Sequence, residues 1–223
     1  MLERIPEPEL MDDEAQARAY AEADFETPHN MFVQLFAERF AGHRVEGSVL
    51  DLGCGPGDVT IRFARAYPHC RIHGVDGSQA MLKHGCAALE REGLKPRVRL
   101  IHAYLPSAAL AGRGDDIVIS NSLLHHLARP DALWRSVKSA ARPGAAVFVM
   151  DLRRPDSRER VEALVREYAA DEPDVLRRDF HNSLLAAYTP EEVRGQLAEA
   201  GLEALAVEAV TDRHLIVHGC LPG

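Results

Sequence analysis

The sequence predicts an α/β fold, built on a doubly wound, seven-stranded, mostly parallel sheet whose last strand runs antiparallel. One observation behind this prediction is that short apolar segments alternate with amphipathic helical segments throughout residues 47–151. Such alternation is typical of parallel strands that are covered by helices on both faces. A second observation is that Val207–Val210 and Leu215–Val217 are joined by the short polar turn Thr211–Arg213, which predicts an antiparallel pair.

Two helices are expected ahead of the first strand, and we interpret residues 1–46 as a helical cap. From Asp12 to about Asp24 the chain is rich in Ala, Glu, Gln and Arg, which favour helix formation. From about Asn30 to Ala41 apolar side chains recur at helical spacing, and Gly42 is a suitable stop. These apolar side chains are Met31, Phe32, Leu35, Phe36 and Phe40.

The alternating core is expected to hold the first five strands and the helices between them. Its first strand, Val49–Leu52, is followed by a helical pattern whose apolar residues are Val59, Ile61, Phe63, Ala64 and Tyr67. The other expected elements are strand Arg71–Val75, helix Gln79–Arg91, strand Val98–Ile101, strand Ile117–Ser120, helix Pro130–Ala141 and strand Ala145–Asp151.

The alternation stops at residues 152–188, which we interpret as a helical lid inserted before the sixth strand. The segment is charged, and Leu164, Val165 and Tyr168 form its expected apolar stripe. Thr189-Pro190-Glu191-Glu192 then has the marks of a helix start: a capping hydroxyl, a first-turn proline and acidic residues. This helix is expected to stop at Gly201, so residues 189–223 comprise a helix and a β-hairpin. Residues 1–223 are expected to form a single domain.

The composition argues against several classes of protein. A formal net charge of −8 over 223 residues disfavours a nucleic-acid partner, because such partners select basic grooves. No apolar run reaches the roughly 20 residues that span a membrane, and the amino terminus lacks the pattern of a secretory signal. A cytoplasmic protein without a membrane partner is therefore expected. The scattered cysteines are interpreted as small buried side chains: Cys54, Cys70, Cys86 and Cys220.

A glycine-rich loop follows the first expected strand. Gly53, Gly55 and Gly57 separate that strand from the next helix. Glycine permits a tight turn and lets a ligand approach the unpaired N–H groups of a helix start. The second expected strand ends at Asp76, whose carboxylate is suited to accept hydrogen bonds from both hydroxyls of a ribose.

Four motifs occur in order around the expected sheet. They are Val49-Leu50-Asp51-Leu52-Gly53-Cys54-Gly55-Pro56-Gly57, Gly74-Val75-Asp76-Gly77-Ser78 with Met81-Leu82, Asp116-Ile117-Val118-Ile119-Ser120-Asn121 with Leu124-His125-His126-Leu127, and Arg142-Pro143-Gly144-Ala145. This series resembles the motifs of class I S-adenosylmethionine-dependent methyltransferases over about Val49 to Asp151, and the last helix and hairpin extend the resemblance. It implies a Rossmann-like fold, S-adenosyl-L-methionine as the cofactor and methyl transfer as the activity.

The resemblance also implies which residues bind the cofactor. Asp51 and the glycine loop would hold its methionine end, and Asp76 would bind the ribose. Ser78 and Met81 would border the adenine. His102 stands where the family commonly has aspartate, so the adenine contact is expected from the backbone of Ala103. The complete expected set is Asp51, Gly53, Cys54, Gly55, Gly57, Asp76, Gly77, Ser78, Met81, Ala103 and Asn121.

Asn121 and His125 are the candidate catalytic residues. Asn121 ends the fourth expected strand, at the sheet edge where ligands bind, and a histidine close by is able to serve as a base near neutral pH. A packing role for His125 and His126 is the favoured alternative. No metal is expected, since these histidines lack a ligand pattern such as HExxH. The residues expected to close over the acceptor are Tyr20, Phe25, Asn30, Arg178 and His181.

We therefore expect transfer of a methyl group from S-adenosyl-L-methionine to a small-molecule acceptor of unspecified identity. Three alternatives stay open: a methyltransferase acting on RNA or protein, a non-catalytic domain that binds the cofactor, and a related transfer from the same cofactor family, such as aminopropyl transfer. The Asn-Pro-Pro-aromatic signature of many nucleic-acid enzymes is absent, because Asn121 is followed by Ser122-Leu123. Whether the chain is a monomer or a homodimer is also open.

Overall fold

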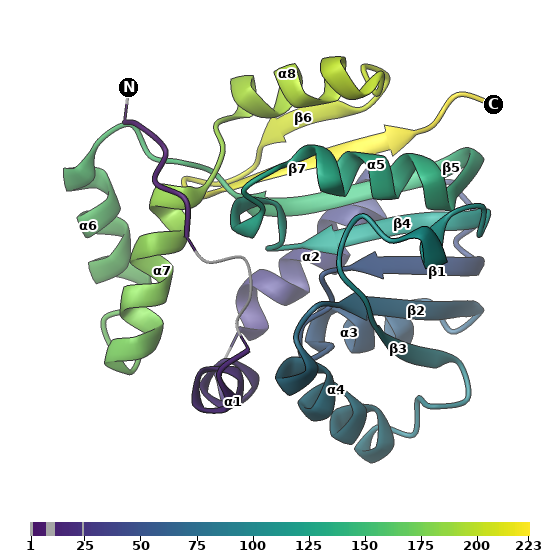
Figure 1. Cartoon of the computed structure of the whole chain (residues 1–223), viewed down its shortest axis with the longest axis horizontal. Coiled ribbons are helices and arrows are strands. Elements are labelled where there is room, and N and C mark those ends of the chain that lie inside the picture. The colour runs from purple at the N-terminus through teal and green to yellow at the C-terminus, as the bar shows by residue number, and fades with distance from the viewer. Residues whose placement is uncertain (1, 8–11, 24) are drawn as a thin grey trace.

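A computed structural model describes residues 2–7, 12–23 and 25–223 of the chain (Figure 1). Its strands are β1 (Gly47–Leu52), β2 (Cys70–Asp76), β3 (Val98–His102), β4 (Asp115–Asn121), β5 (Ala141–Leu152), β6 (Ala206–Ala209) and β7 (His214–Cys220). Within the described ranges they form one seven-stranded sheet of order β3-β2-β1-β4-β5-β7-β6. β1 to β5 pair in parallel, whereas β7 runs antiparallel to both β5 and β6. The predicted fold class is confirmed.

Helices flank the sheet and extend beyond it at the left of the view in Figure 1. They are α1 (Glu14–Glu22), α2 (Glu26–Arg39), α3 (Asp58–Ala66), α4 (Gln79–Arg91), α5 (Asp131–Ala140), α6 (Arg158–Tyr168), α7 (Asp174–Ala186) and α8 (Pro190–Ala200), with short 3-10 turns η1 (Ala108–Leu110) and η2 (Leu124–His126). None of the helices in the described ranges has the length and apolar character that crossing a membrane requires.

The sheet is buried on both faces, and each face has its own apolar core. Neighbouring residues of a strand point to opposite faces, so Val49 and Leu50 belong to different clusters. The Val49 cluster includes Phe36 of α2 and Phe63 of α3, and the Leu50 cluster includes Trp134 of α5. Because both faces are covered, the central strands are apolar throughout, which is the pattern that marked them in the sequence.

The first two helices differ from their expected boundaries. α2 begins at Glu26 rather than near Asn30, because Pro28 falls in its first turn, where a missing N–H costs no hydrogen bond. α1 ends at Glu22, and the expected end near Asp24 lies outside the described residues. By contrast, α8 begins after the expected N-cap Thr189, whose Oγ1 accepts from the N–H of Glu192, and the structure adds a capping box because the Glu192 side chain accepts from the N–H of Thr189.

The helical insertion forms a small apolar cluster of its own. α6 and α7 pack together there, with Leu164 and Leu184 fully buried. The expected apolar stripe was wrong at Tyr168, which is 41% exposed. The guanidinium of Arg213 stacks over its ring at 3.3 Å, so the aromatic face is covered by a cation and not by the core.

The expectation of buried cysteines holds for two of the four. Cys54 and Cys70 are buried, Cys220 is half-buried, and Cys86 is exposed. Cys86 was wrongly expected to be buried because it lies on the outward side of α4, where the helix presents its polar residues to solvent. All four are free thiols.

Candidate functional site

A cavity of about 910 Å³ lies at the carboxyl ends of β1, β2 and β4. The order of the strands reverses beside β1, since β2 and β3 lie on one side of it and β4 and β5 on the other. Ligands of open α/β sheets bind at such a reversal. Gly53 after β1, Asp76 at the end of β2 and Asn121 at the end of β4 all line the cavity.

The glycine loop turns sharply over the end of β2. Gly53 has φ 71°, and a Cβ there would lie 2.7 Å from the side chain of Leu123. The N–H groups of Gly53 and Cys54 donate to the Val75 carbonyl at 2.8 and 3.0 Å. Gly55 has φ 51°, and no atom lies within 4 Å of the place where its Cβ would stand. The loop therefore needs glycine for its backbone, and at Gly55 it leaves open space for a ligand.

Asp76 connects the glycine loop to the loop that follows β2. Its two carboxylate oxygens accept from the N–H groups of Gly55 and Ser78, each at 2.8 Å. Burial raises the pKa of Asp76, and these two backbone hydrogen bonds act against that rise. His102, the departure from the family pattern, has Nε2 2.9 Å from the Gly77 carbonyl and so supports the same loop. The N–H of Ala103 donates to the Asp76 carbonyl at 3.0 Å.

Asp51 and Cys54 are the other ionisable groups of the first motif. Asp51 is 1% exposed and accepts a hydrogen bond of 2.5 Å from Thr60 Oγ1. Burial raises the pKa of Asp51 to about 7. Burial also raises the pKa of the Cys54 thiol, which keeps it protonated and a poor nucleophile.

Ser78 and Met81 form the wall of the cavity beside α4. Ser78 is the N-cap of that helix, and its Oγ accepts from the N–H of Met81 at 3.1 Å. Both side chains are buried, and Gly77 lines the cavity with them. The expected adenine wall thus lies at the cavity, while its contact with adenine stays a prediction.

Asn121 lines the cavity and carries a buried, unsatisfied polar atom. Its Nδ2 donates to Ser122 Oγ at 3.1 Å, whereas its Oδ1 is buried and has no hydrogen-bond partner among the described residues. Ser122 adopts φ 53°, an unfavourable value for a residue other than glycine, and its N–H donates to the Met150 carbonyl. Strained turns and orphaned acceptors of this kind are typical of ligand sites.

The two histidines of η2 differ in what they face. His125 is 3% exposed, does not line the cavity among the described residues, and has Nδ1 2.5 Å from Asp151 Oδ1. Burial lowers the pKa of His125, but the Asp151 and Glu7 carboxylates outweigh it and raise that pKa overall. His126 does line the cavity. A catalytic role for His125 stays a prediction.

The helical cap supplies the wall opposite the sheet. Tyr20 and Phe25 line the cavity, with ring centroids 4.7 Å apart, and buried His29 lines it too. Burial raises the pKa of Tyr20 to about 12, so its phenol stays protonated. Asn30 is exposed, accepts a hydrogen bond of 2.6 Å from Arg62 and lies outside the described cavity wall.

The insertion contributes no described residue to the cavity wall. Arg178 is exposed, 3.8 Å from the Asp179 carboxylate, and His181 contacts Asn182 at 3.5 Å. Their proposed contact with an acceptor stays a prediction. Ser122 and Asp58 line the cavity and were missed from the sequence. Asp58 follows Gly57 directly at the start of α3, a position that already indicated a place beside the loop.

The part of the chain that carries this site is similar to known proteins. Residues 49–144, which contain the glycine loop, Asp76 and Asn121, match the family model of the methyltransferase domain. A trans-aconitate 2-methyltransferase from Variovorax paradoxus is 32% identical over 126 residues, which are 56% of this chain and 45% of that protein. Over this stretch the chain is similar to the methyltransferase domain, and the curated relatives that it matches include methyltransferases. It spans about half the length of the curated relatives it matches.

Solved methyltransferases share the fold across almost the whole chain. A SAM-dependent methyltransferase from Aquifex aeolicus superposes with a TM-score of 0.68 at 17% identity, covering 94% of this chain and 98% of that one. A Haemonchus contortus phosphoethanolamine N-methyltransferase, solved with phosphomonomethylethanolamine and S-adenosylhomocysteine, gives 0.71 at 15% identity, covering 94% and 58%. At these identities the likeness is one of fold, and it extends the match beyond residues 49–144.

Proposed function

We propose that this chain transfers a methyl group from S-adenosylmethionine to a small-molecule acceptor. The observation that carries the proposal is the cavity at which the glycine loop, Asp76 and Asn121 meet. Its volume of about 910 Å³ is in the upper part of the range of small-molecule sites. The match of residues 49–144 to the methyltransferase domain supports this cofactor.

The described residues fit the cofactor on three counts. The space at Gly55, where a Cβ would meet no atom within 4 Å, allows a ligand to reach the backbone. The carboxylate of Asp76 is a hydrogen-bond acceptor suited to a ribose diol. Asn121 also lines the cavity at the end of β4, where a side-chain amide is suited to hydrogen-bond the polar end of a ligand.

Catalysis by this site rests on positioning. S-adenosylmethionine supplies a methyl group already activated on a sulfonium, so the protein needs no covalent intermediate. The residues of the cap and of η2 would hold the acceptor in line and exclude water, an effect worth about 7–11 kcal/mol in favourable cases. With its raised pKa, Tyr20 is suited to donate a hydrogen bond to the acceptor, and His126 is the histidine that lines the cavity.

A small acceptor is supported by the cap and by the charge of the chain. The cavity is covered by Tyr20, Phe25 and His29, which leave less room for a folded macromolecule than an open groove does. A formal net charge of −8 disfavours nucleic acid. The curated relatives include trans-aconitate methyltransferases, so small carboxylic acids are the first acceptors to assay. The cytoplasmic location remains a prediction.

Replacing Asp76 tests the cofactor site. We expect S-adenosylhomocysteine to bind the wild-type protein with micromolar affinity, and the variant Asp76→Ala to bind at least about tenfold more weakly because a charge-assisted pair is lost. Isothermal titration calorimetry measures both. The matched control is Asp171→Ala, at an exposed carboxylate outside the described cavity wall, and it should bind like the wild type. Equal affinity of Asp76→Ala and wild type would contradict the ribose assignment.

The acceptor is identified in a second experiment. The protein is incubated with S-adenosylmethionine carrying a heavy methyl group and with a cell extract, and the products are analysed by mass spectrometry. A small molecule that gains the labelled methyl group supports the proposal. Label found only in RNA or protein would contradict it.

A further inference from the structure

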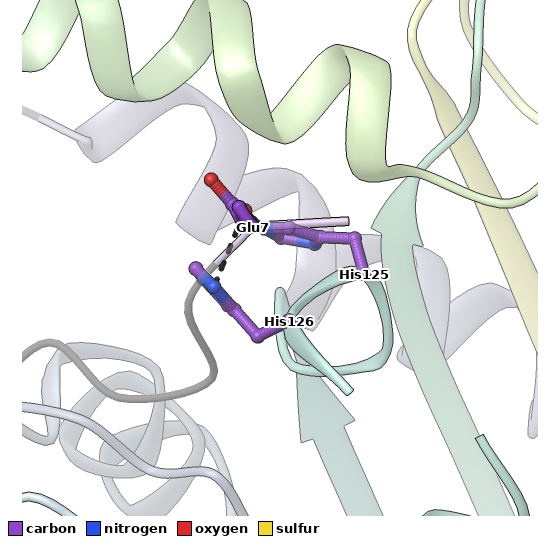
Figure 2. A group of neighbouring side chains, drawn as sticks. All are labelled: Glu7, His125 and His126. Atoms are coloured by element: carbon purple, nitrogen blue, oxygen red, sulfur yellow. Dashed lines mark ion pairs between the residues drawn. The ribbon is translucent and has the colours of Figure 1, made fainter. Parts of the chain in front are cut away.

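The amino-terminal segment brings a carboxylate onto the two histidines of η2. Figure 2 shows the side chains of Glu7, His125 and His126 pointing toward one another. We propose that these three side chains bind a transition-metal dication, with Zn²⁺ as the representative ion. The sequence showed no metal-ligand spacing because Glu7 is far from the histidines along the chain, and folding alone brings them together.

The spacing of the donor atoms suits a single ion. Glu7 Oε1 lies 3.2 Å from His126 Nδ1 and 3.6 Å from His125 Nε2, and all three ligand atoms lie within 4.8 Å of one another. Zinc binds nitrogen and oxygen ligands at about 2.0–2.2 Å, so tetrahedral neighbours stand about 3.3 Å apart. The two distances from Glu7 bracket this value. Two imidazoles and one carboxylate are also a donor set that zinc and ferrous iron sites use.

Two outer hydrogen bonds hold the donors in place. Asp151 Oδ1 lies 2.5 Å from His125 Nδ1, so a proton on Nδ1 leaves the lone pair of Nε2 directed toward Glu7. Ser183 Oγ donates to Glu7 Oε1 at 3.0 Å. A carboxylate behind a ligating histidine and a hydrogen bond to the ligating carboxylate are the supports that metal ligands require.

Charge and burial favour a bound cation. The side chains of Glu7, His125 and His126 are only 10%, 3% and 16% exposed. Asp151 and Asp179 add negative charge near Glu7, and the guanidinium of Arg4 lies close to His125. Burying carboxylates together is costly unless positive charge offsets them, which a dication would do.

The position of the cluster connects the ion to the acceptor. His126 lines the cavity, so the ion would lie at the cavity wall. Three protein ligands are fewer than the four of a closed structural zinc site, which leaves a position for water or an acceptor oxygen. This last step rests on the proposed function, whereas binding of the ion itself does not.

Metal titration of the full chain without an affinity tag tests the proposal. The protein is stripped with a chelator and titrated with Co²⁺, followed by visible absorption, and with Zn²⁺, followed by calorimetry. One ion per chain is expected. Glu7→Gln keeps an acceptor for Ser183 but loses the charged ligand, and His126→Asn loses a nitrogen ligand. Each should weaken binding at least about tenfold.

The control removes a carboxylate from a different pair of a glutamate and a histidine. Glu208 Oε1 lies 2.7 Å from His218 Nε2, outside the cluster, so Glu208→Gln should bind metal like the wild type. Thermal unfolding gives a measurement that does not depend on enzymatic activity. Zn²⁺ should raise the Tm of the wild type and of Glu208→Gln, but not that of Glu7→Gln. A wild type that binds no ion, or binding that both cluster variants retain, would overturn the proposal.

The same samples separate this inference from the proposed function. S-adenosylhomocysteine is titrated into the metal-free wild type and into Glu7→Gln. If S-adenosylhomocysteine binds both proteins but the wild type takes up no ion, only the proposal of a metal site is contradicted. If an ion binds and the cofactor product does not, only the cofactor site fails.

Discussion

Asp51 lies in β1, two residues before Gly53, with 1% of its surface exposed and Thr60 Oγ1 donating to it at 2.5 Å. Burial raises its pKa to about 7, above the ordinary value of 3.8 that applies to the unfolded chain. Between these values the folded chain binds the proton that the unfolded chain releases. The contribution of Asp51 to stability is therefore complete at low pH and is lost as pH rises through about 7.

Cofactor binding should change this protonation. S-adenosylmethionine carries a sulfonium and an ammonium, and positive charge in the cavity favours the carboxylate form of Asp51. We expect binding to release a proton below about pH 7 and to tighten as pH rises through that value. Calorimetry in two buffers of different ionisation enthalpy measures the release. Asp51→Asn should bind with no such buffer dependence, and proton uptake by the wild type would refute the prediction.

Two glycines of the same loop should respond differently to alanine. Gly53→Ala places a Cβ 2.7 Å from Leu123 at φ 71°, so we expect a loss of about 2–4 kcal/mol of stability from clash and strain together. Gly55→Ala meets no atom, so it should lose only about 1–2 kcal/mol from its φ of 51°. Urea denaturation compares the two.

Gly55→Ala, the more stable of the two variants, should nevertheless bind the ligand weakly. Gly55→Ala fills the space reserved for the cofactor, so its affinity for S-adenosylhomocysteine should fall at least about tenfold although it folds well. Wild-type affinity in Gly55→Ala would show that no ligand approaches this backbone.

At the scale of elements, the helices most precisely predicted are those with chemical signals at their ends. α8 begins at a capping box and stops at Gly201, which has φ 65°. α2 lacks a side-chain cap at Phe25, and its first turn went unrecognised in the sequence. A cap fixes a helix end because it satisfies N–H groups that have no partner within the helix.

Removing the cap of α8 should have a measurable effect. Thr189→Ala loses the hydrogen bond from the N–H of Glu192 to Thr189 Oγ1, at a cost of about 1 kcal/mol, and keeps the bond from its own backbone N–H to the Glu192 side chain. For a chain of this size that corresponds to a fall of about 2–4 °C in Tm. Thr27→Ala, at an exposed first-turn threonine of α2, is the matched control and should change stability by under about 0.5 kcal/mol. Equal Tm values for Thr189→Ala and Thr27→Ala would argue that the Thr189 cap does not stabilise α8.

At the scale of the whole molecule, two buried groups give stability opposite pH dependences. His214 is 6% exposed, and burial lowers its pKa to about 4 from its ordinary value of 6.5. The unfolded chain therefore binds more protons between these values. The contribution of His214 is complete above about pH 6.5 and is lost on acidification, whereas that of Asp51 is lost as pH rises.

The His214 contribution can be isolated by difference. Between pH 8 and pH 5 the wild type should lose about 2 kcal/mol through this histidine, and His214→Gln should not. Urea denaturation of both proteins at each pH gives the difference, from which the contribution of Asp51 cancels. We expect the gap in stability between wild type and variant to narrow by that amount at pH 5. A gap that stays constant or widens on acidification would contradict the lowered pKa.

The sequence by itself determined the sheet, the glycine loop and the acidic residue of the cofactor site. Strands buried on both faces need continuous apolar runs, and the loop needs glycine at positive φ, as Gly53 and Gly55 have. Asp76 could be placed beside the loop because consecutive strands of such a unit are neighbours, and the structure joins it to Gly55. These features depend on residues close together in the chain or on a fixed crossover rule.

Only the tertiary structure decided which distant segments meet. The helical cap, and not the described insertion, lines the cavity with Tyr20 and Phe25, although both segments are helical and charged. Glu7 lies on His125 and His126 because Arg4 and Ile5 anchor its segment to η2 and α7 through backbone carbonyls. Backbone carbonyls are present at every residue, so no sequence pattern specifies which of them such a segment selects. That choice follows from the summed packing of the folded chain.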